Sequence, residues 1–121
     1  MNSVGGFGIA NVDIIFGNAD RMPKLGEEIY SGYCSKQLGG GAVATLIQLS
    51  RLGIPVKLAT YIGEGLLSKF LKKELEKNKI EFTNMLSSDE EDPVTLSCVV
   101  SCKQDRGIVS YKPGEAAFIV D

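Results

Sequence analysis

Apolar and polar positions along the chain predict alternating strands and helices. The apolar segment from Ile9 to Phe16 is rich in β-branched residues, which favours a buried first strand. A second extended segment is expected over 27–35 and a third strand over 55–62. Helical periodicity is expected at about 42–52, where most sides are apolar and burial should follow, and at about 66–78, where lysines and glutamates form a solvated face. This order predicts an α/β protein.

The C-terminal part of the chain predicts a hairpin. Segments 93–102 and 107–112 flank the turn residues Gln104-Asp105-Arg106-Gly107. The strand–helix–strand part predicts parallel pairing with a right-handed crossover, so the hairpin should lie apart from it. The chain ends on the apolar run Phe118-Ile119-Val120 before Asp121, and an apolar run without a closing polar segment suggests a cut chain.

Two polar residues, Asn11 and Asp13, interrupt the first predicted strand. Being two positions apart, they lie on the same face of a strand. Polar side chains on an apolar strand cost free energy unless they are paired or contacted by a ligand. They are therefore candidate binding residues, although backbone groups at the strand end would also satisfy them.

Three consecutive glycines, Gly39, Gly40 and Gly41, precede the first predicted helix. Glycine lets a ligand approach the backbone, and the free N–H groups of a helix N-terminus suit hydroxyl-rich or anionic ligands. The alternative is that the glycines serve only close packing of helix on sheet.

The composition and net charge of the chain limit the kinds of partner that it is expected to bind. The chain has 121 residues, 44% hydrophobic content and a net charge of −2, as expected of a folded domain without a surface for nucleic acid or membrane. Its apolar runs are too short to cross a bilayer, and no signal peptide is expected from the N-terminal sequence. Three cysteines fit a reducing cytoplasm better than a disulfide framework.

Several partial motifs for metal, nucleotide or catalytic sites are incomplete in this sequence. Cys98 and Cys102 share a strand face, but a metal site needs more ligands and the chain has no histidine, so we expect the cysteines to be buried apolar side chains. The acidic segment 87–92 lacks the spaced glycine of a calcium loop. Gly6-Phe7-Gly8 half-matches a dinucleotide fingerprint, but no strand is predicted before it and a strand follows where a helix is required. Neither a Walker A loop nor a Ser-His-Asp triad is present.

Six short motifs follow one another at compatible spacing. They are Gly8-Ile9-Ala10-Asn11-Val12-Asp13, Leu25-Gly26-Glu27, Gly39-Gly40-Gly41, Arg51-Leu52-Gly53, Ile62-Gly63-Glu64 and Asn78-Lys79-Ile80. In this order the chain, from about Val4 to Ala117, resembles the N-terminal half of the ribokinase-like (PfkB) carbohydrate kinases. The resemblance implies a three-layer α/β sandwich with a small β lid. It also implies transfer of the γ-phosphoryl of ATP, with Mg²⁺, to a hydroxyl of a sugar or nucleoside.

By the same resemblance, Asn11 and Asp13 would hydrogen-bond sugar hydroxyls, and the three glycines would bring the backbone against the sugar. Core segments are expected at about 4–26 and 36–85, and lid strands at about 27–35 and 93–112.

The chain departs from the family pattern at three places. Ala44 stands where the family usually has Asn, and Gly65 replaces the second residue of an acidic pair, which would remove a sugar contact and favour an acceptor other than ribose or an ordinary hexose. The Gly-Ala-Gly-Asp-type segment, which carries the catalytic base and the anion hole, is absent. We therefore assign no catalytic, nucleotide-binding or metal-binding residue, and expect the chain alone to bind ATP and Mg²⁺ weakly and to be inactive.

A non-catalytic sugar-binding or dimerisation module is the alternative. The predicted hairpin offers an exposed strand edge, which favours a homodimer through the β lid.

Overall fold

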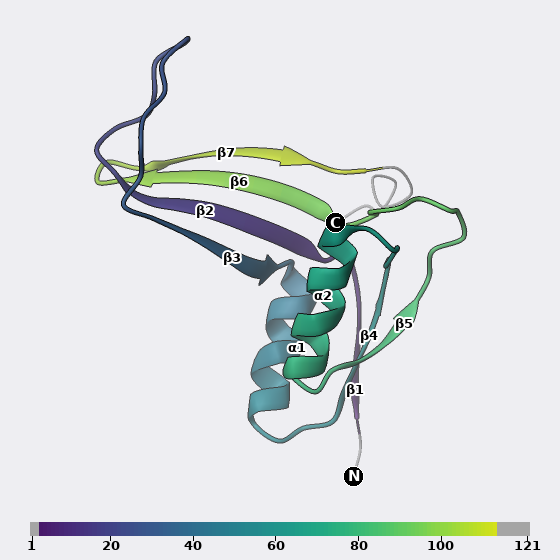
Figure 1. Ribbon diagram of the computed structural model, residues 1–121. Coiled ribbons are helices and arrows are strands. Elements are labelled where there is room, and N and C mark those ends of the chain that lie inside the picture. The colour runs from purple at the N-terminus through teal and green to yellow at the C-terminus, as the bar shows by residue number, and fades with distance from the viewer. Residues whose placement is uncertain (1–2, 114–121) are drawn as a thin grey trace.

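The computed structural model describes residues 3–113, which form two sheets and two helices (Figure 1). The elements in chain order are β1 (Val4–Phe7), β2 (Asn11–Ala19), β3 (Tyr33–Gly39), α1 (Gly41–Arg51), β4 (Val56–Thr60), α2 (Leu66–Lys77), β5 (Glu81–Asn84), β6 (Thr95–Cys102) and β7 (Arg106–Tyr111). The predicted α/β class is confirmed. The terminal apolar run 118–120 lies outside the described residues.

The smaller sheet has the order β1-β4-β5, and all its strands are parallel. Strand β4 pairs with β5 after the chain passes through α2, which confirms the parallel strand–helix–strand unit. Helices α1 and α2 lie side by side against this sheet (Figure 1).

The larger sheet has the order β3-β2-β6-β7 and extends away from the helices (Figure 1). Strands β2 and β6 are parallel, whereas β2 with β3 and β6 with β7 are antiparallel. The predicted hairpin is confirmed as β6–β7, and it lies in a different sheet from β4 and β5. Strand β2 belongs to this larger sheet, where it pairs on both sides.

Strand β1 was missed by the sequence analysis because half of it is glycine. A Cβ at Gly6 would lie 2.9 Å from Cδ1 of Leu46, so glycine at this position lets α1 pack close to the strand. The prediction that no strand lies before Gly6-Phe7-Gly8 was wrong, because β1 begins two residues earlier, at Val4. The following element is still a strand, β2, so the dinucleotide fingerprint remains excluded.

Two strand boundaries also differ from prediction. Strand β2 starts at Asn11 and continues beyond Phe16 to Ala19, through an irregularity where Asn18 has a φ of 57°. The second strand is Tyr33–Gly39 rather than 27–35, because this stretch pairs with β2 from Asn11 to Gly17.

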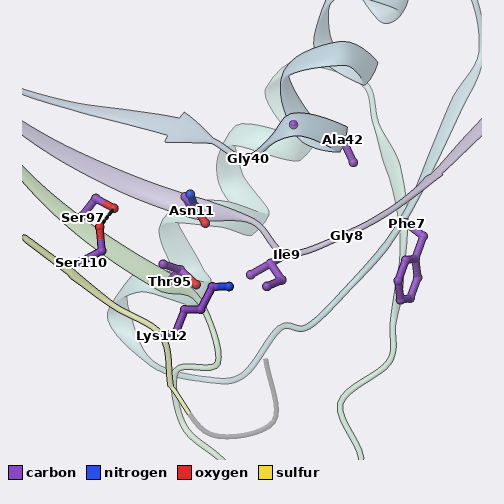
Figure 2. A pocket seen from close by; sticks show the side chains of 11 residues that line it. Phe7, Gly8, Ile9, Asn11, Gly40, Ala42, Thr95, Ser97, Ser110 and Lys112 are labelled. Carbon is purple, nitrogen blue, oxygen red and sulfur yellow. Dashed lines mark hydrogen bonds between the residues drawn. The ribbon is translucent and has the colours of Figure 1, made fainter. Parts of the chain in front are cut away.

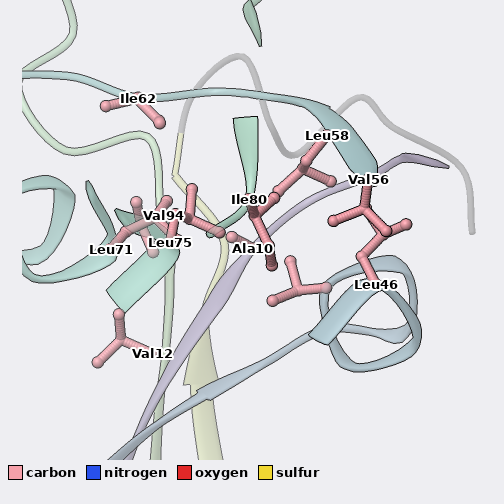
Figure 3. Packing of buried hydrophobic residues seen from close by; sticks show 11 residues of the cluster. Ala10, Val12, Leu46, Val56, Leu58, Ile62, Leu71, Leu75, Ile80 and Val94 are labelled. Carbon is pink, nitrogen blue, oxygen red and sulfur yellow. The ribbon is translucent and has the colours of Figure 1, made fainter. Parts of the chain in front are cut away.

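The hydrophobic core lies between the helices and the two sheets (Figure 3). Helix α2 contributes Leu71 and Leu75, both fully buried. Helix α1 buries Val43 and Leu46 but exposes its opposite face, so it is less buried than its apolar sequence predicted. The remaining cluster members come from strands and connections: Ala10, Val12, Val56, Leu58, Ile62, Ile80 and Val94.

The expectation that the cysteines are buried was wrong. Cys34 and Cys98 are exposed and Cys102 is half-buried, and all three are free thiols. The reason is that one face of the larger sheet is open: Cys98 is opposite Ile14, and Cys34 is opposite Phe16, across neighbouring strands. No helix within residues 3–113 is long and apolar enough to cross a membrane.

Candidate functional site

A cavity of about 600 Å³ lies where the two sheets and the start of α1 meet (Figure 2). Its wall combines backbone, neutral polar and apolar groups with one cation. The lining residues are Phe7, Gly8, Ile9, Asn11, Gly40, Gly41, Ala42, Thr95, Ser97, Ser110 and Lys112.

The glycine run forms the helix entry that the sequence predicted. Gly40 is the N-cap residue of α1, with a φ of 101°, and a Cβ there would lie 2.6 Å from the carbonyl oxygen of Ile9. Both the backbone conformation and the space therefore require glycine. By contrast, a Cβ at Gly41 would meet nothing within 4 Å. Packing explains Gly40, whereas Gly41 borders open space in the cavity.

Gly39 lies beside both polar residues of β2. A Cβ at position 39 would be 2.8 Å from Oδ2 of Asp13 and 3.5 Å from Cβ of Asn11. Asn11 lines the cavity, but Asp13 lines an adjoining hollow of about 410 Å³. The two hollows share Ser97, so the predicted pair spans their junction.

Neither Asn11 nor Asp13 donates or accepts a side-chain hydrogen bond within the described part of the chain. The alternative that backbone groups at the end of the strand satisfy Asn11 and Asp13 is therefore not observed among the described residues. A polar group in this state is available to a ligand.

Two residues of β6 complete the polar face, and the sequence analysis missed them. Thr95 is opposite Asn11, and Ser97 is opposite Asp13, in the parallel β2–β6 pairing. Thr95 is only 3% exposed, and its Oγ1 has no hydrogen-bond partner among the described residues. Ser97 Oγ lies 2.7 Å from Oγ of Ser110 (Figure 2). The alternation of Thr95 and Ser97 with Leu96 was a usable signal, but its meaning depends on knowing that β6 pairs with β2.

Two features of the described residues bring positive charge to the wall of the cavity. Lys112 is the one charged residue among the described lining residues, and Figure 2 shows its side chain beside Thr95. The N-terminus of α1 adds the positive end of the helix dipole. Arg106 lines the adjoining hollow together with Asp13. The arrangement supplies many hydrogen-bond donors and acceptors and suits a compact polyol.

The two positions that depart from the family pattern lie outside both hollows. Ala44 is on the exposed face of α1. Gly65 lies against Asp92, since a Cβ there would be 2.1 Å from Oδ2 of Asp92.

The pfkB family carbohydrate kinase model matches residues 1–121. The chain belongs to this family.

Solved ribokinases share the fold of this pfkB family member. The ribokinase of Thermotoga maritima superposes with a TM-score of 0.71 at 20% identity, over 90% of this chain and 36% of its own length. Arabidopsis thaliana ribokinase, complexed with ribose and ATP, gives 0.70 at 20% identity, covering 90% and 35% of the two chains. Giardia lamblia ribokinase gives 0.77 at 13% identity, covering 92% and 36%. The search of curated proteins finds no match.

The pfkB chain therefore spans about a third of the length of these ribokinases, rather than the half expected. Residues 3–113 contain no group of three or more metal-ligating side chains. We assign none of the described residues to ATP or Mg²⁺.

Proposed function

We propose that this chain is the acceptor-binding part of an ATP-dependent carbohydrate kinase. The observation that carries the proposal is the polar face formed by β2 and β6, where Asn11, Asp13 and Thr95 have no side-chain partners among the described residues. This face lies opposite the bare N-terminus of α1. A sugar or the ribose of a nucleoside would supply the missing partners.

Each residue has a distinct role in this proposal. The Asn11 amide both donates and accepts, so it suits one hydroxyl in either direction, while the Asp13 carboxylate accepts from hydroxyl groups. Gly39 leaves room for that carboxylate. Gly40 and Gly41 form the backbone wall, where first-turn N–H groups of α1 are available.

Phosphoryl transfer would need groups beyond these residues. It depends on a positioned nucleophile and on stabilisation of charge at the phosphate, and the described residues supply only acceptor binding. In the proposal, the base, the anion hole and the sites for ATP and Mg²⁺ belong to parts of the enzyme outside this chain, which is inactive by itself. The three free cysteines support a cytoplasmic location.

We further propose that the larger sheet is the lid and that it mediates a homodimer. Its strands β6 and β7 lie in the predicted lid segment 93–112, whereas β3 overlaps the predicted segment 27–35 only at 33–35, and β2 comes from the expected core segment 4–26. Within residues 3–113, strands β3 and β7 are its edge strands. Its face away from the cavity carries the exposed side chains of Phe16, Val109 and Tyr111. In the alternative proposal, a non-catalytic sugar-binding or dimerisation module, the chain would dimerise through this same larger sheet. Sedimentation equilibrium tests the dimer: a monomer at all concentrations contradicts it.

Calorimetry with a panel of monosaccharides, nucleosides and ATP tests the acceptor site. We expect at least one sugar or nucleoside to bind and Asp13→Ala to weaken its binding about ten- to a hundred-fold, the range for a lost hydrogen bond to a charged group. Lys77→Ala, on the exposed face of α2, is the matched control. Absence of any acceptor binding, or ATP turnover by the chain alone, would contradict the proposal.

A further inference from the structure

Helix α2 begins without a capping side chain of its own. Its N-cap residue is Gly65, which makes no side-chain cap. The first N–H groups of a helix have no partners inside the helix, and Ser, Thr, Asp or Asn usually satisfies one of them from the N-cap position.

The missing cap comes from a distant segment, at Asp92. Its Oδ1 accepts a hydrogen bond from the backbone N–H of Ser68 at 2.8 Å, and its Oδ2 accepts one from Leu67 at 3.3 Å. A carboxylate at this place also complements the positive end of the helix dipole. Asp92 thus caps α2 from outside the helix.

The surroundings are shaped for this contact. A Cβ at Gly65 would lie 2.1 Å from Oδ2 of Asp92, and one at Gly63 would lie 2.1 Å from the carbonyl oxygen of Glu91. The N–H of Gly65 donates to that same carbonyl at 2.8 Å. Ser68 Oγ, fully buried, accepts from the N–H of Gly63 at 2.9 Å. Gly63 therefore makes room for the backbone at Glu91, and Gly65 makes room for the carboxylate of Asp92, so a side chain at position 65 would meet that carboxylate rather than the backbone of the segment.

The anchored segment leads directly into the cavity wall. Pro93 and Val94 are buried, and Val94 belongs to the core cluster. The next residue is Thr95, whose N–H donates to the carbonyl of Ala10 at 3.2 Å. Figure 1 shows the start of β6 beside the N-terminal end of α2.

We propose that Asp92 is a positioning residue. It ties the start of β6 to α2 and thereby places Thr95, and the polar face beside it, at the cavity. Its effect on acceptor affinity rests on the proposed function, whereas its effect on the start of β6 does not.

Amide hydrogen exchange in the equilibrium regime tests the proposal without any ligand. In Asp92→Ala we expect exchange at Ser68 and at Thr95 to be about five to thirty times faster, the factor that a lost cap of 1–2 kcal/mol corresponds to. Leu58 in β4 is the internal reference, and Asp89→Ala, in the same acidic segment, is the matched control. Asp92→Asn should retain most of the protection, because asparagine also accepts at an N-cap.

A swap variant separates capping from positioning. In Gly65→Asp/Asp92→Ala the capping carboxylate returns to the helix itself, so Ser68 should regain protection while Thr95 remains fast. Recovery at both residues would overturn the proposal, as would unchanged exchange at Thr95 in Asp92→Ala. Equal acceleration at Leu58, Ser68 and Thr95 would also overturn it, because it reports global unfolding.

Calorimetry adds the second readout, with the acceptor that the wild-type chain binds. Affinity should fall in Asp92→Ala and stay low in the swap variant; an affinity restored by the swap contradicts positioning. If the wild-type chain binds no acceptor, the proposed function fails while the exchange result still stands or falls by itself.

Discussion

The carboxylate of Asp13 occupies space that Gly39 leaves open, with only 2.8 Å between Oδ2 and the place where a Cβ at position 39 would be. The two residues belong to adjacent antiparallel strands, so a side chain at position 39 would contact the carboxylate of Asp13.

Gly39→Ala should therefore act through Asp13. The added methyl group displaces a flexible side chain rather than backbone, so the free energy of unfolding should change by less than about 1 kcal/mol. Acceptor affinity should fall by about ten-fold, because a displaced carboxylate loses hydrogen bonds to hydroxyl groups. Urea unfolding measures the stability, and binding calorimetry measures the acceptor affinity of Gly39→Ala, Asp13→Ala and the double variant. If the loss of affinity in the double variant equals the product of the two single losses, the two residues act independently and this explanation fails.

Gly40→Ala should destabilise the fold. Its φ of 101° and the 2.6 Å approach to the carbonyl of Ile9 both oppose a side chain, at a cost of about 1–3 kcal/mol. Gly41→Ala is the control, since its Cβ meets open space and alanine there should raise stability by about 0.4–1 kcal/mol. Urea unfolding checks both, and similar losses at the two positions would disprove the contrast.

Thr95→Val should raise stability while lowering acceptor affinity. Valine has nearly the same shape and removes a buried hydroxyl that lacks a partner, so unfolding should become harder by about 1 kcal/mol. Ser97→Ala offers a matched comparison, because its hydroxyl is bonded to that of Ser110 and its loss should cost about 0.5–1.5 kcal/mol. A destabilised Thr95→Val would mean that the hydroxyl already has a partner.

Glu27 should titrate with a pKa of about 2. The side-chain hydrogen bonds from Arg21, at 2.5 and 2.8 Å, and the backbone N–H of Lys24 lower it from its ordinary value of 4.5. Because the folded pKa is the lower one, the stabilising contribution of this pair is complete above pH 4.5 and is lost as the pH falls towards 2. Carboxyl NMR should follow the shift, and Arg21→Gln should move the midpoint up towards 4.5, whereas Lys24→Gln should not, since its backbone N–H remains.

The sequence predicted the local parts of the site and missed its long-range parts. Asn11, Asp13 and the glycine run were accessible because strand alternation and helix entry are local properties. Thr95 joined them only through the β2–β6 pairing, which brings together segments far apart in the chain. The predicted position of the second strand was wrong for a related reason. Ile29 and Tyr30 have strand-forming side chains, but pairing with β2 determines where β3 lies. The chain before these residues turns at Gly26, which has a φ of 79°. Which roles these residues have remains a prediction.

Gly65 shows how a departure from a family pattern gains meaning only in three dimensions. The sequence suggested a lost sugar contact. The structure places this glycine against Asp92, outside both hollows, where its missing side chain makes room for another carboxylate.

Within residues 3–113 the chain passes between the two sheets three times: from β1 to β2, from β3 through α1 to β4, and from β5 to β6. Gly8, Gly40 and Thr95 mark these crossings, and all three line the cavity. The cavity therefore lies at the junction of the two sheets, and residues connected to both of them form its wall. A molecule bound there would contact both sheets, so its binding should slow amide hydrogen exchange in strands of both sheets.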